Sequence, residues 1–320
     1  MPDYPETILE FRDWFADEDA CREYLARLRW PDGFVCPRCD DREYWKMKRG
    51  LYWCRGCDYQ TSVTAGTLFA DSHKPLRLWF ETMWYVTNQK YGVSALGLMR
   101  VLGLGSYDTA WTWLHKLRRA MVRPGRDRLQ GEIQVDETFI GGVRPGKRGR
   151  GAEGKTLVLI AAQAADKGIG RIRLKQIEDA SGTSLESALL TMAEPGCKIR
   201  TDGWQGYTGL KALGYDHQVI RESKDVGDNL LPLANRVAAL IKRWLLGTHQ
   251  GAVQFSHLDY YLDEYTFRFN RRSSRSRGLL FYRLIDQAVH LHPIERVELT
   301  EKAAADAKKA QESLDSPNRE

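Results

Sequence analysis

The chain has 320 residues and a formal net charge of +6, and 42% of its residues are hydrophobic. This length allows two or three compact domains, and the mild positive charge favours a polyanionic partner. No stretch approaches the roughly 18 apolar residues that a membrane span requires, and the N-terminus lacks the pattern of a signal peptide. These features exclude a membrane transporter and a secreted disulfide scaffold. We therefore expect a cytoplasmic protein without a membrane partner.

Residues 1–33 predict a helical lead with an apolar stripe. The next segment, residues 34–70, holds two Cys-x-x-Cys pairs, Cys36 with Cys39 and Cys54 with Cys57. Four thiolates at this spacing bind Zn²⁺ tetrahedrally and can stabilise a module too small for its own core. We predict a zinc ribbon with an internal hairpin that contacts DNA. The alternative is a structural zinc site without DNA contact.

Residues 71–125 read as three helices, and a glycine, Gly103, ends the second of them. A short turn before the third helix, with Ser106 or Asp108 as its N-cap, is typical of a helix-turn-helix DNA-binding segment. An ordinary helical linker fits the same spacing.

From residue 131 the hydrophobic period changes to that of strands, and a domain is expected over residues 131–292. Three successive strands come first, followed by alternating helices and strands and then a long helix from about residue 230 to 246. This order predicts an α/β fold in which helices cover a mixed sheet. The polar tail, residues 293–320, is expected to be disordered.

Two acids stand where this sheet would place functional groups. Asp136 lies in an alternating strand and projects to the side opposite Ile133 and Val135. Asp202 ends an apolar strand just before a glycine, which is a usual position for functional groups in α/β sheets. Each alone is more often a turn or capping residue, but together they favour a metal site. Asn235 lies on the long helix, opposite its apolar stripe.

Basic residues gather in three places. They are predicted to contact DNA phosphates, with a solvated loop or a disordered connector as the alternatives. They are Lys147, Arg148 and Arg150 in a Gly/Arg-rich loop, Lys242 and Arg243 on the long helix, and Arg271 and Arg272 in an Arg/Ser-rich segment.

Taken together, the motifs CPRC…CRGC, SVTAGTLF, VDETFIGG, TDGWQGY, LIKRWLLGTHQGAV and YLDEYTFRFNRR resemble bacterial insertion-sequence transposases of the zinc-ribbon type, in the DDE superfamily (ISXO-like). The resemblance runs from about residue 10 to 292. It implies an RNase H-like catalytic domain that binds the terminal inverted repeats of its element and performs metal-dependent hydrolysis and strand transfer. By the same resemblance Asp136, Asp202 and Asn235 hold Mg²⁺ or Mn²⁺, and at least two subunits assemble on double-stranded DNA.

The third catalytic position is usually Glu in this superfamily, so Asn235 is a departure. One hypothesis is that a nearby acid, Glu137, Asp225 or Asp228, supplies the missing charge. Two other functions stay open: a decayed or regulatory zinc-ribbon DNA-binding protein, and an RNase H-like nuclease that cuts independently of inverted repeats. The sequence leaves open the repeat sequence, the transposition pathway and the number of subunits.

Overall fold

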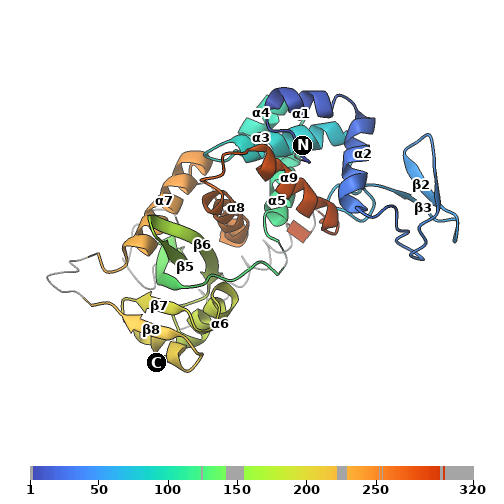
Figure 1. Cartoon of the computed structure of the whole chain (residues 1–320). Coiled ribbons are helices and arrows are strands. Elements are labelled where there is room, and N and C mark those ends of the chain that lie inside the picture. The colour runs from blue at the N-terminus through green and yellow to red at the C-terminus, as the bar shows by residue number, and fades with distance from the viewer. Residues whose placement is uncertain are drawn as a thin grey trace, which may run out of the picture. The chain divides into compact units, whose positions relative to one another are not determined.

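The computed structural model describes residues 3–123, 125–141, 155–221, 229–251, 253, 255–295 and 298–299. The chain folds as two compact units that divide after residue 123 and again after residue 273 (Figure 1). The domain limits expected from the sequence stay predictions. Among the described helices, none combines the length and apolar character needed to cross a bilayer.

The first unit is built around a cluster of aromatic side chains. Its helices are α1 (Ile8–Trp14), α2 (Glu18–Arg29), α3 (Leu76–Asn88), α4 (Ala95–Leu102), α5 (Tyr107–Ala120) and α9 (Gly278–His290). Phe281 of α9 is fully buried and contacts Phe11, Phe15 and Phe80 with ring centroids 5.4 to 5.9 Å apart. The lead region is therefore two short helices, and α9 completes the core that they begin.

Helices α4 and α5 end and begin as the sequence predicts. Gly103 has φ +61° and closes α4 in the left-handed conformation, which glycine adopts without steric cost. Ser106 caps α5 by accepting a hydrogen bond from the Thr109 N–H at 3.1 Å. Trp79 of α3 stacks on Trp113 of α5 at 3.8 Å, which fixes the third helix against the first. The role of this segment in DNA binding stays a prediction.

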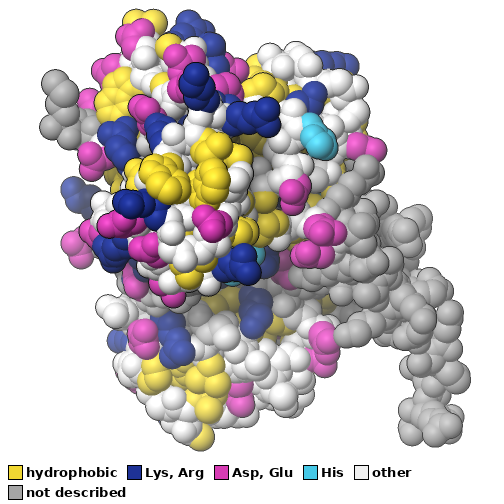
Figure 2. Space-filling model, turned by 90° about the vertical axis from the view of Figure 1, so that its right-hand side faces the viewer, with side chains coloured by type: hydrophobic (Ala, Val, Ile, Leu, Met, Phe, Trp, Pro, Cys, Tyr) yellow, Lys and Arg dark blue, Asp and Glu magenta, His cyan; other side chains and the backbone are white. Residues whose placement is uncertain are grey.

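The cysteine-rich segment forms a small antiparallel sheet of β1 (Tyr44–Lys46), β2 (Leu51–Cys54) and β3 (Gln60–Ser62). Gly50, with φ +76°, lies in the β1–β2 turn, as the hairpin prediction required. Phe34 stacks on Tyr52 at 5.4 Å and forms a small aromatic core. Figure 2 looks onto the ribbon side of the chain, where apolar groups lie among both signs of charge.

The second unit contains a five-stranded mixed sheet in the order β6-β5-β4-β7-β8. Its strands are β4 (Glu132–Ile140), β5 (Thr156–Ala165), β6 (Gly168–Ile177), β7 (Lys198–Thr201) and β8 (Asp216–Val219). β4, β5 and β6 pair antiparallel, whereas β7 and β8 run parallel to β4. This arrangement confirms the predicted mixed α/β sheet and is that of an RNase H-like domain.

Helices cover both faces of this sheet (Figure 1). One face packs on α6 (Gly182–Met192) and the 3₁₀ helix η1 (Gln205–Lys211), and the other packs on α7 (Pro232–His249) and α8 (Leu258–Asn270), which follows the 3₁₀ turn η2 (Phe255–His257). The segment GYTGLKALG, residues 206–214, has the pattern of a helix, and the structure forms the 3₁₀ helix η1 there. Its two glycines, Gly206 and Gly209, disfavour an α-helix, and 3₁₀ geometry suits short connectors.

Candidate active site and four-cysteine centre

The four predicted cysteines of the ribbon meet at one point. Their sulfur atoms all lie within 4.8 Å of one another, with Cys36 to Cys57 at 3.7 Å and Cys39 to Cys54 at 3.5 Å. A tetrahedral site with Zn–S distances of about 2.3 Å has sulfur–sulfur edges of about 3.8 Å, so the donor set fits such an ion. Among the described residues, no other three His, Cys, Asp or Glu side chains gather their ligand atoms this closely.

The two halves of this centre have the same backbone design. In each half an aspartate four residues after the first cysteine donates its N–H to that cysteine's carbonyl, Asp40 to Cys36 at 3.0 Å and Asp58 to Cys54 at 3.1 Å. Both aspartates are left-handed, with φ of 61° and 58°, a conformation that Asp tolerates better than most residues. Burial raises the pKa of the Cys36 thiol, but the N–H groups of Arg38 and Cys39 lower it to about 7.

In the second unit, Asp136 lies in the middle of β4 and faces α7. Its partner on β5, Ile160, belongs to the apolar cluster under α7 and α8. Glu137 pairs with Leu159, which belongs to the cluster on the opposite face. Since directly paired residues point to the same side of a sheet, the predicted orientation of Asp136 is supported. Glu137 projects from the other face, so it is poorly placed to supply a missing ligand beside Asp136.

Sheet register brings Asp202 level with Asp136. β4 and β7 run parallel, with Glu132 beside Lys198 and Gln134 beside Arg200. The same offset carried two residues further places Asp202 beside Asp136, on strands that lie about 4.8 Å apart. Asp202 is exposed and follows directly on the carboxyl end of β7. Two residues that are 66 positions apart in the sequence therefore lie level with each other on neighbouring strands.

The segment TDGWQGY holds Asp202 in a tight turn. One carboxylate oxygen, Oδ1, accepts the Trp204 N–H at 2.9 Å, so Asp202 also has the turn-forming role that was its alternative interpretation. Gly203 has φ +84°, and a Cβ there would lie 2.4 Å from a Val219 methyl, so only glycine fits. Trp204 Nε1 donates to the Ala180 carbonyl at 2.8 Å and ties the turn to the start of α6.

Tyr207 connects this turn to β4, a link that the sequence did not reveal. It is only 1% exposed, and its hydroxyl donates to Glu137 Oε2 at 2.6 Å. Burial raises the pKa of Tyr207, and the negative charges of Glu137, Asp136 and Asp202 raise it further. The hydroxyl is therefore held as a protonated donor close to both candidate acids.

Helix α7 begins against the strand that carries Asp136. It has no cap from its own segment, and Gln134 of β4 instead accepts the Leu233 N–H at 2.8 Å. Asn235 follows two residues later and is exposed. Its side-chain amide nitrogen donates to Asn229 Oδ1 at 2.8 Å, which makes its carbonyl oxygen the atom suited to a metal. Gln134 thus fixes where the helix that carries Asn235 starts.

Two further turns of α7 bring Lys242 into the electrostatic field of Asp136. Partial burial lowers the pKa of Lys242, the charge of Lys155 lowers it further, and Asp136 acts in the opposite direction. The charges of Asp136 on β4 and of Lys155 just before β5 therefore both act on Lys242 of α7. Arg243, the adjacent predicted DNA contact, is exposed.

The remaining predicted DNA contacts differ in their surroundings. Lys147, Arg148 and Arg150 lie outside the described residues, as do Asp225 and Asp228. The guanidinium of Arg272 lies 4.0 Å from the Phe269 ring centroid and donates to the carbonyls of Gly170 and Ile169 at the start of β6. Arg271 lies 4.1 Å from the ring centroid of Phe267. Both arginines anchor the end of α8, and their contact with DNA stays a prediction.

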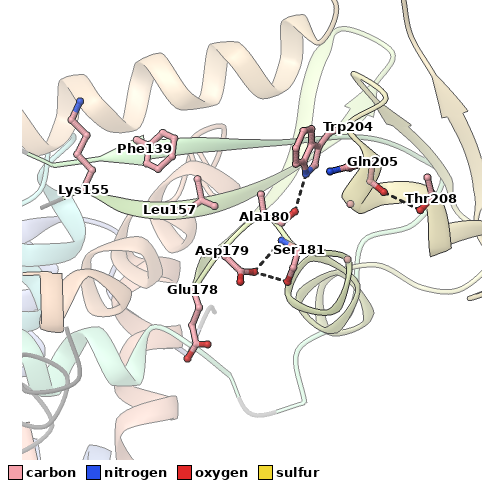
Figure 3. Close-up of a pocket in the computed structure, with 12 residues that line it drawn as sticks. Phe139, Lys155, Leu157, Glu178, Asp179, Ala180, Ser181, Trp204, Gln205 and Thr208 are labelled. Atoms are coloured by element: carbon pink, nitrogen blue, oxygen red, sulfur yellow. Dashed lines mark hydrogen bonds between the residues drawn. The ribbon is translucent and has the colours of Figure 1, made fainter. Parts of the chain in front are cut away.

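A pocket of about 990 Å³ opens beside the Asp202 turn (Figure 3). Strand ends, the start of α6 and the start of η1 form its wall. The residues most relevant to its chemistry are Phe139, Lys155, Glu178, Asp179, Ser181 and Trp204. Nothing in the sequence marked this pocket, because its members come from four separate segments.

Two family models match the chain over its two characteristic regions. The ISXO2-like transposase domain matches residues 128–270, and the transposase zinc-ribbon domain matches residues 16–60. The chain carries both domains of a zinc-ribbon transposase. Both matches confirm the resemblance that the motifs indicated, and the matched transposase domain includes Asp136, Asp202 and Asn235.

One curated protein and two solved structures illustrate what the chain is similar to. An uncharacterized protein in transposable element ISH50 of Halobacterium salinarum is 27% identical over 279 residues, which is 79% of this transposase and 91% of that protein. Among solved structures, a Mos1 transposase paired-end complex with left transposon end is 14% identical, covers 74% of this chain and 82% of the other, and has a TM-score of 0.30. The Mos1 strand transfer complex has the same identity and coverage of this chain, covers 80% of the other, and has a TM-score of 0.28.

Proposed function

We propose that this transposase cuts and joins DNA at the sheet edge where Asp136, Asp202 and Asn235 lie. The observation that supports this most strongly is the β4–β7 register. Continued by two residues, it sets Asp202, just after the carboxyl end of β7, level with Asp136 in the middle of β4. The helix that carries Asn235 starts against the same strand through Gln134. The three residues offer carboxylate and amide oxygens, which are the ligands that Mg²⁺ and Mn²⁺ prefer.

Each residue has a defined task in this proposal. Asp136 and Asp202 hold the divalent ions, and Asn235 adds a neutral oxygen at the third position. When bound, a pair of such ions activates water for phosphodiester hydrolysis and stabilises the leaving 3′-oxygen. Tyr207 and Gly203 hold the Asp202 turn in place against β4. Lys242, two turns beyond Asn235, holds a DNA phosphate next to the acids.

The substrate in this proposal is double-stranded DNA that carries the terminal inverted repeats of the element. The ribbon, with Zn²⁺ held by its four cysteines, and helices α3 to α5 would bind the repeats. The freed 3′-hydroxyl would then attack target DNA at the same sheet edge. Because both ends must be joined, at least two subunits would assemble on DNA.

A second candidate is a transposase that binds repeats without cutting them. The neutral Asn235 favours it, because one negative charge is missing where the superfamily has a carboxylate. The arrangement of Asp136, Asp202 and Tyr207 favours catalysis instead, since a binding protein would not require two carboxylates level with each other on neighbouring strands. An RNase H-like nuclease differs from both by cutting without regard to repeats.

The deciding experiment measures cleavage and joining by the full chain. DNA with the repeats that flank the gene is incubated with Mg²⁺ or Mn²⁺, and Asp202→Ala serves as the inactive comparison. We expect 3′-hydroxyl ends at the repeats and joined products, both lost in the variant. Repeat binding without cleavage would support the non-catalytic candidate, and cleavage of DNA without repeats would support the nuclease.

A further inference from the structure

The pocket beside Asp202 has the features of a binding site for a planar group. It begins at Trp204, whose backbone N–H bonds to Asp202, so the pocket and the candidate active site share one turn. Phe139 and Trp204 are both only partly buried. Figure 3 shows the two rings along the strand ends that border the pocket, with Lys155 at one end and Gln205 and Thr208 at the other. Aromatic faces of this kind stack with nucleic-acid bases whatever their sequence.

Trp204 is held rigidly in the position that such stacking requires. Its backbone N–H is bonded to Asp202, and its indole Nε1 donates to the Ala180 carbonyl. A Cβ at Gly206 would lie 2.6 Å from that carbonyl and 2.9 Å from the indole nitrogen, so a glycine is needed behind the ring. A ring fixed in this way loses little freedom when a ligand stacks on it, which favours binding.

The charges of the pocket decide which part of a nucleotide it can take. Glu178 and Asp179 are exposed carboxylates in its wall, and Lys155 is the cation among the residues that line it. A phosphate would be repelled by the two carboxylates, whereas the exocyclic amine of adenine, cytosine or guanine can donate to them. Lys155 can hold a phosphate at the border of the pocket. The volume of about 990 Å³ is ample for a base, since small-molecule sites span roughly 300–1,000 Å³.

We propose that this pocket receives one unpaired DNA base, an amine-bearing one, from next to the bond that is cut. This inference rests on the proposed function, because it places the base relative to the DNA end at Asp202. Enzymes that act on nucleotides can extrude a base from the stack, and stacking and hydrogen bonding in a pocket then offset the contacts that the base loses. Extrusion of the base would give Asp136 and Asp202 more room to approach the DNA backbone.

The test compares DNA that lacks single bases. Full-length protein binds repeat-end DNA with Ca²⁺ in place of Mg²⁺, so that no strand is cut, and affinity is measured by fluorescence anisotropy. In a series of substrates, one base within about three nucleotides of the cut is replaced by an abasic site. At one position we expect wild-type binding to weaken about tenfold, as loss of a stacked base predicts.

Three variants define the site. Trp204→Ala should bind intact DNA about tenfold more weakly than wild type and should show no further loss at the abasic position. Trp204→Phe keeps an aromatic face and should keep most of the base dependence. Asp166→Asn removes a carboxylate in the exposed β5–β6 turn, outside the pocket lining, and should show the wild-type pattern. Thermal unfolding of each variant checks that it is folded.

Two results would overturn the inference while leaving the transposase proposal intact. One is wild-type binding to repeat ends that no abasic position weakens. The other is an equal loss in Trp204→Ala on every substrate, which would mean that the ring supports the fold and contacts no base. If wild-type protein shows no preference for repeat DNA, both the proposed function and the assignment of the pocket fail.

Discussion

The two sites of this transposase are built in opposite ways. The four-cysteine centre comes from 22 consecutive residues, Cys36–Cys57, and its two halves repeat one turn. The Asp136–Asp202 edge instead joins a strand, a turn and a helix across about a hundred residues, and β4–β7 register and the Tyr207 hydrogen bond align it. A site whose ligands are close together in the sequence depends on its metal for stability. A site whose residues are brought together by the fold depends on the stability of the sheet.

The largest effect is expected at the cysteine centre. Cys54→Ser removes a ligand that is fully buried, and the ribbon has little apolar core of its own. Metal binding contributes about 10–16 kcal/mol to the folding of small zinc modules, so we expect loss of the metal and of hydrogen-exchange protection over residues 34–62. Strands β4 to β6 should keep their protection from hydrogen exchange. The zinc content of the protein is measured together with its hydrogen exchange.

Cys21→Ala is the matched control, because Cys21 is also a fully buried cysteine but lies on α2. It should keep the zinc and the protection of the ribbon. If chelation of the metal left residues 34–62 protected, the ribbon would have a self-sufficient core and the contrast between the two sites would fail.

The next largest effect is expected at the sheet edge. Asp136→Asn removes one charged ligand without changing the side-chain shape, so we expect cleavage to fall at least about a hundredfold. Unlike the cysteine change, it should leave the unfolding temperature and repeat binding nearly unaffected. The measurement is single-turnover cleavage of repeat DNA.

Asp166→Asn, in the exposed β5–β6 turn, is the control for this change and should cleave at the wild-type rate. Activity that survived Asp136→Asn would show that the register brings together two structural residues and no catalytic pair.

A smaller effect is expected from Tyr207→Phe, which removes the hydroxyl that bonds Glu137. We expect a loss of about 1–2 kcal/mol in stability, because the partly buried carboxylate of Glu137 loses this donor. If the bond also aligns the acids, the Mn²⁺ concentration for half-maximal cleavage should rise roughly threefold to tenfold. Tyr215→Phe is a matched control, since Tyr215 is buried in the same cluster and donates to the Ala193 carbonyl at 3.1 Å. It should cost similar stability and leave the metal requirement unchanged.

Sequence reasoning succeeded where the determinants are local. The cysteine spacing predicts the ribbon, and strand alternation predicts which way Asp136 points. Gly103 and Ser106 mark the ends of α4 and α5 because caps act within one turn. The same alternation already placed Glu137 on the face opposite Asp136, so the hypothesis that it replaces the missing ligand conflicted with the strand pattern.

The remaining features depend on strand order, which periodicity does not determine. The register between β4 and β7 brings Asp202 beside Asp136, and no local signal states that these two strands are neighbours. Tyr207 meets Glu137 across 70 residues, and the Trp204 pocket gathers residues from four segments. Gln134 is a polar residue on the same face of β4 as Asp136, yet it is buried and caps α7.

Asn235→Asp sharpens the comparison by adding the charge that the superfamily usually has. A carboxylate in place of the amide should tighten Mn²⁺ binding by roughly threefold to tenfold, measured by electron paramagnetic resonance. Asn229→Asp adds the same charge next to Asn235 without adding it at the third position. If both variants tighten binding equally, Asn235 acts only through the local field, and its role as a ligand is contradicted.

The smallest effect is expected from Lys242→Met. Loss of one phosphate contact should weaken DNA binding a few-fold at low salt. The slope of the logarithm of the binding constant against the logarithm of the salt concentration should become less steep by about 0.9. Because burial and Lys155 lower the pKa of Lys242, its amine loses its charge at a lower pH than an ordinary lysine does. The affinity difference from wild type should therefore be full at neutral pH and shrink as the pH rises toward that lowered pKa. Lys167→Met, in the exposed β5–β6 turn, should show neither the loss nor the pH dependence, and an equal loss there would mean that only net charge matters.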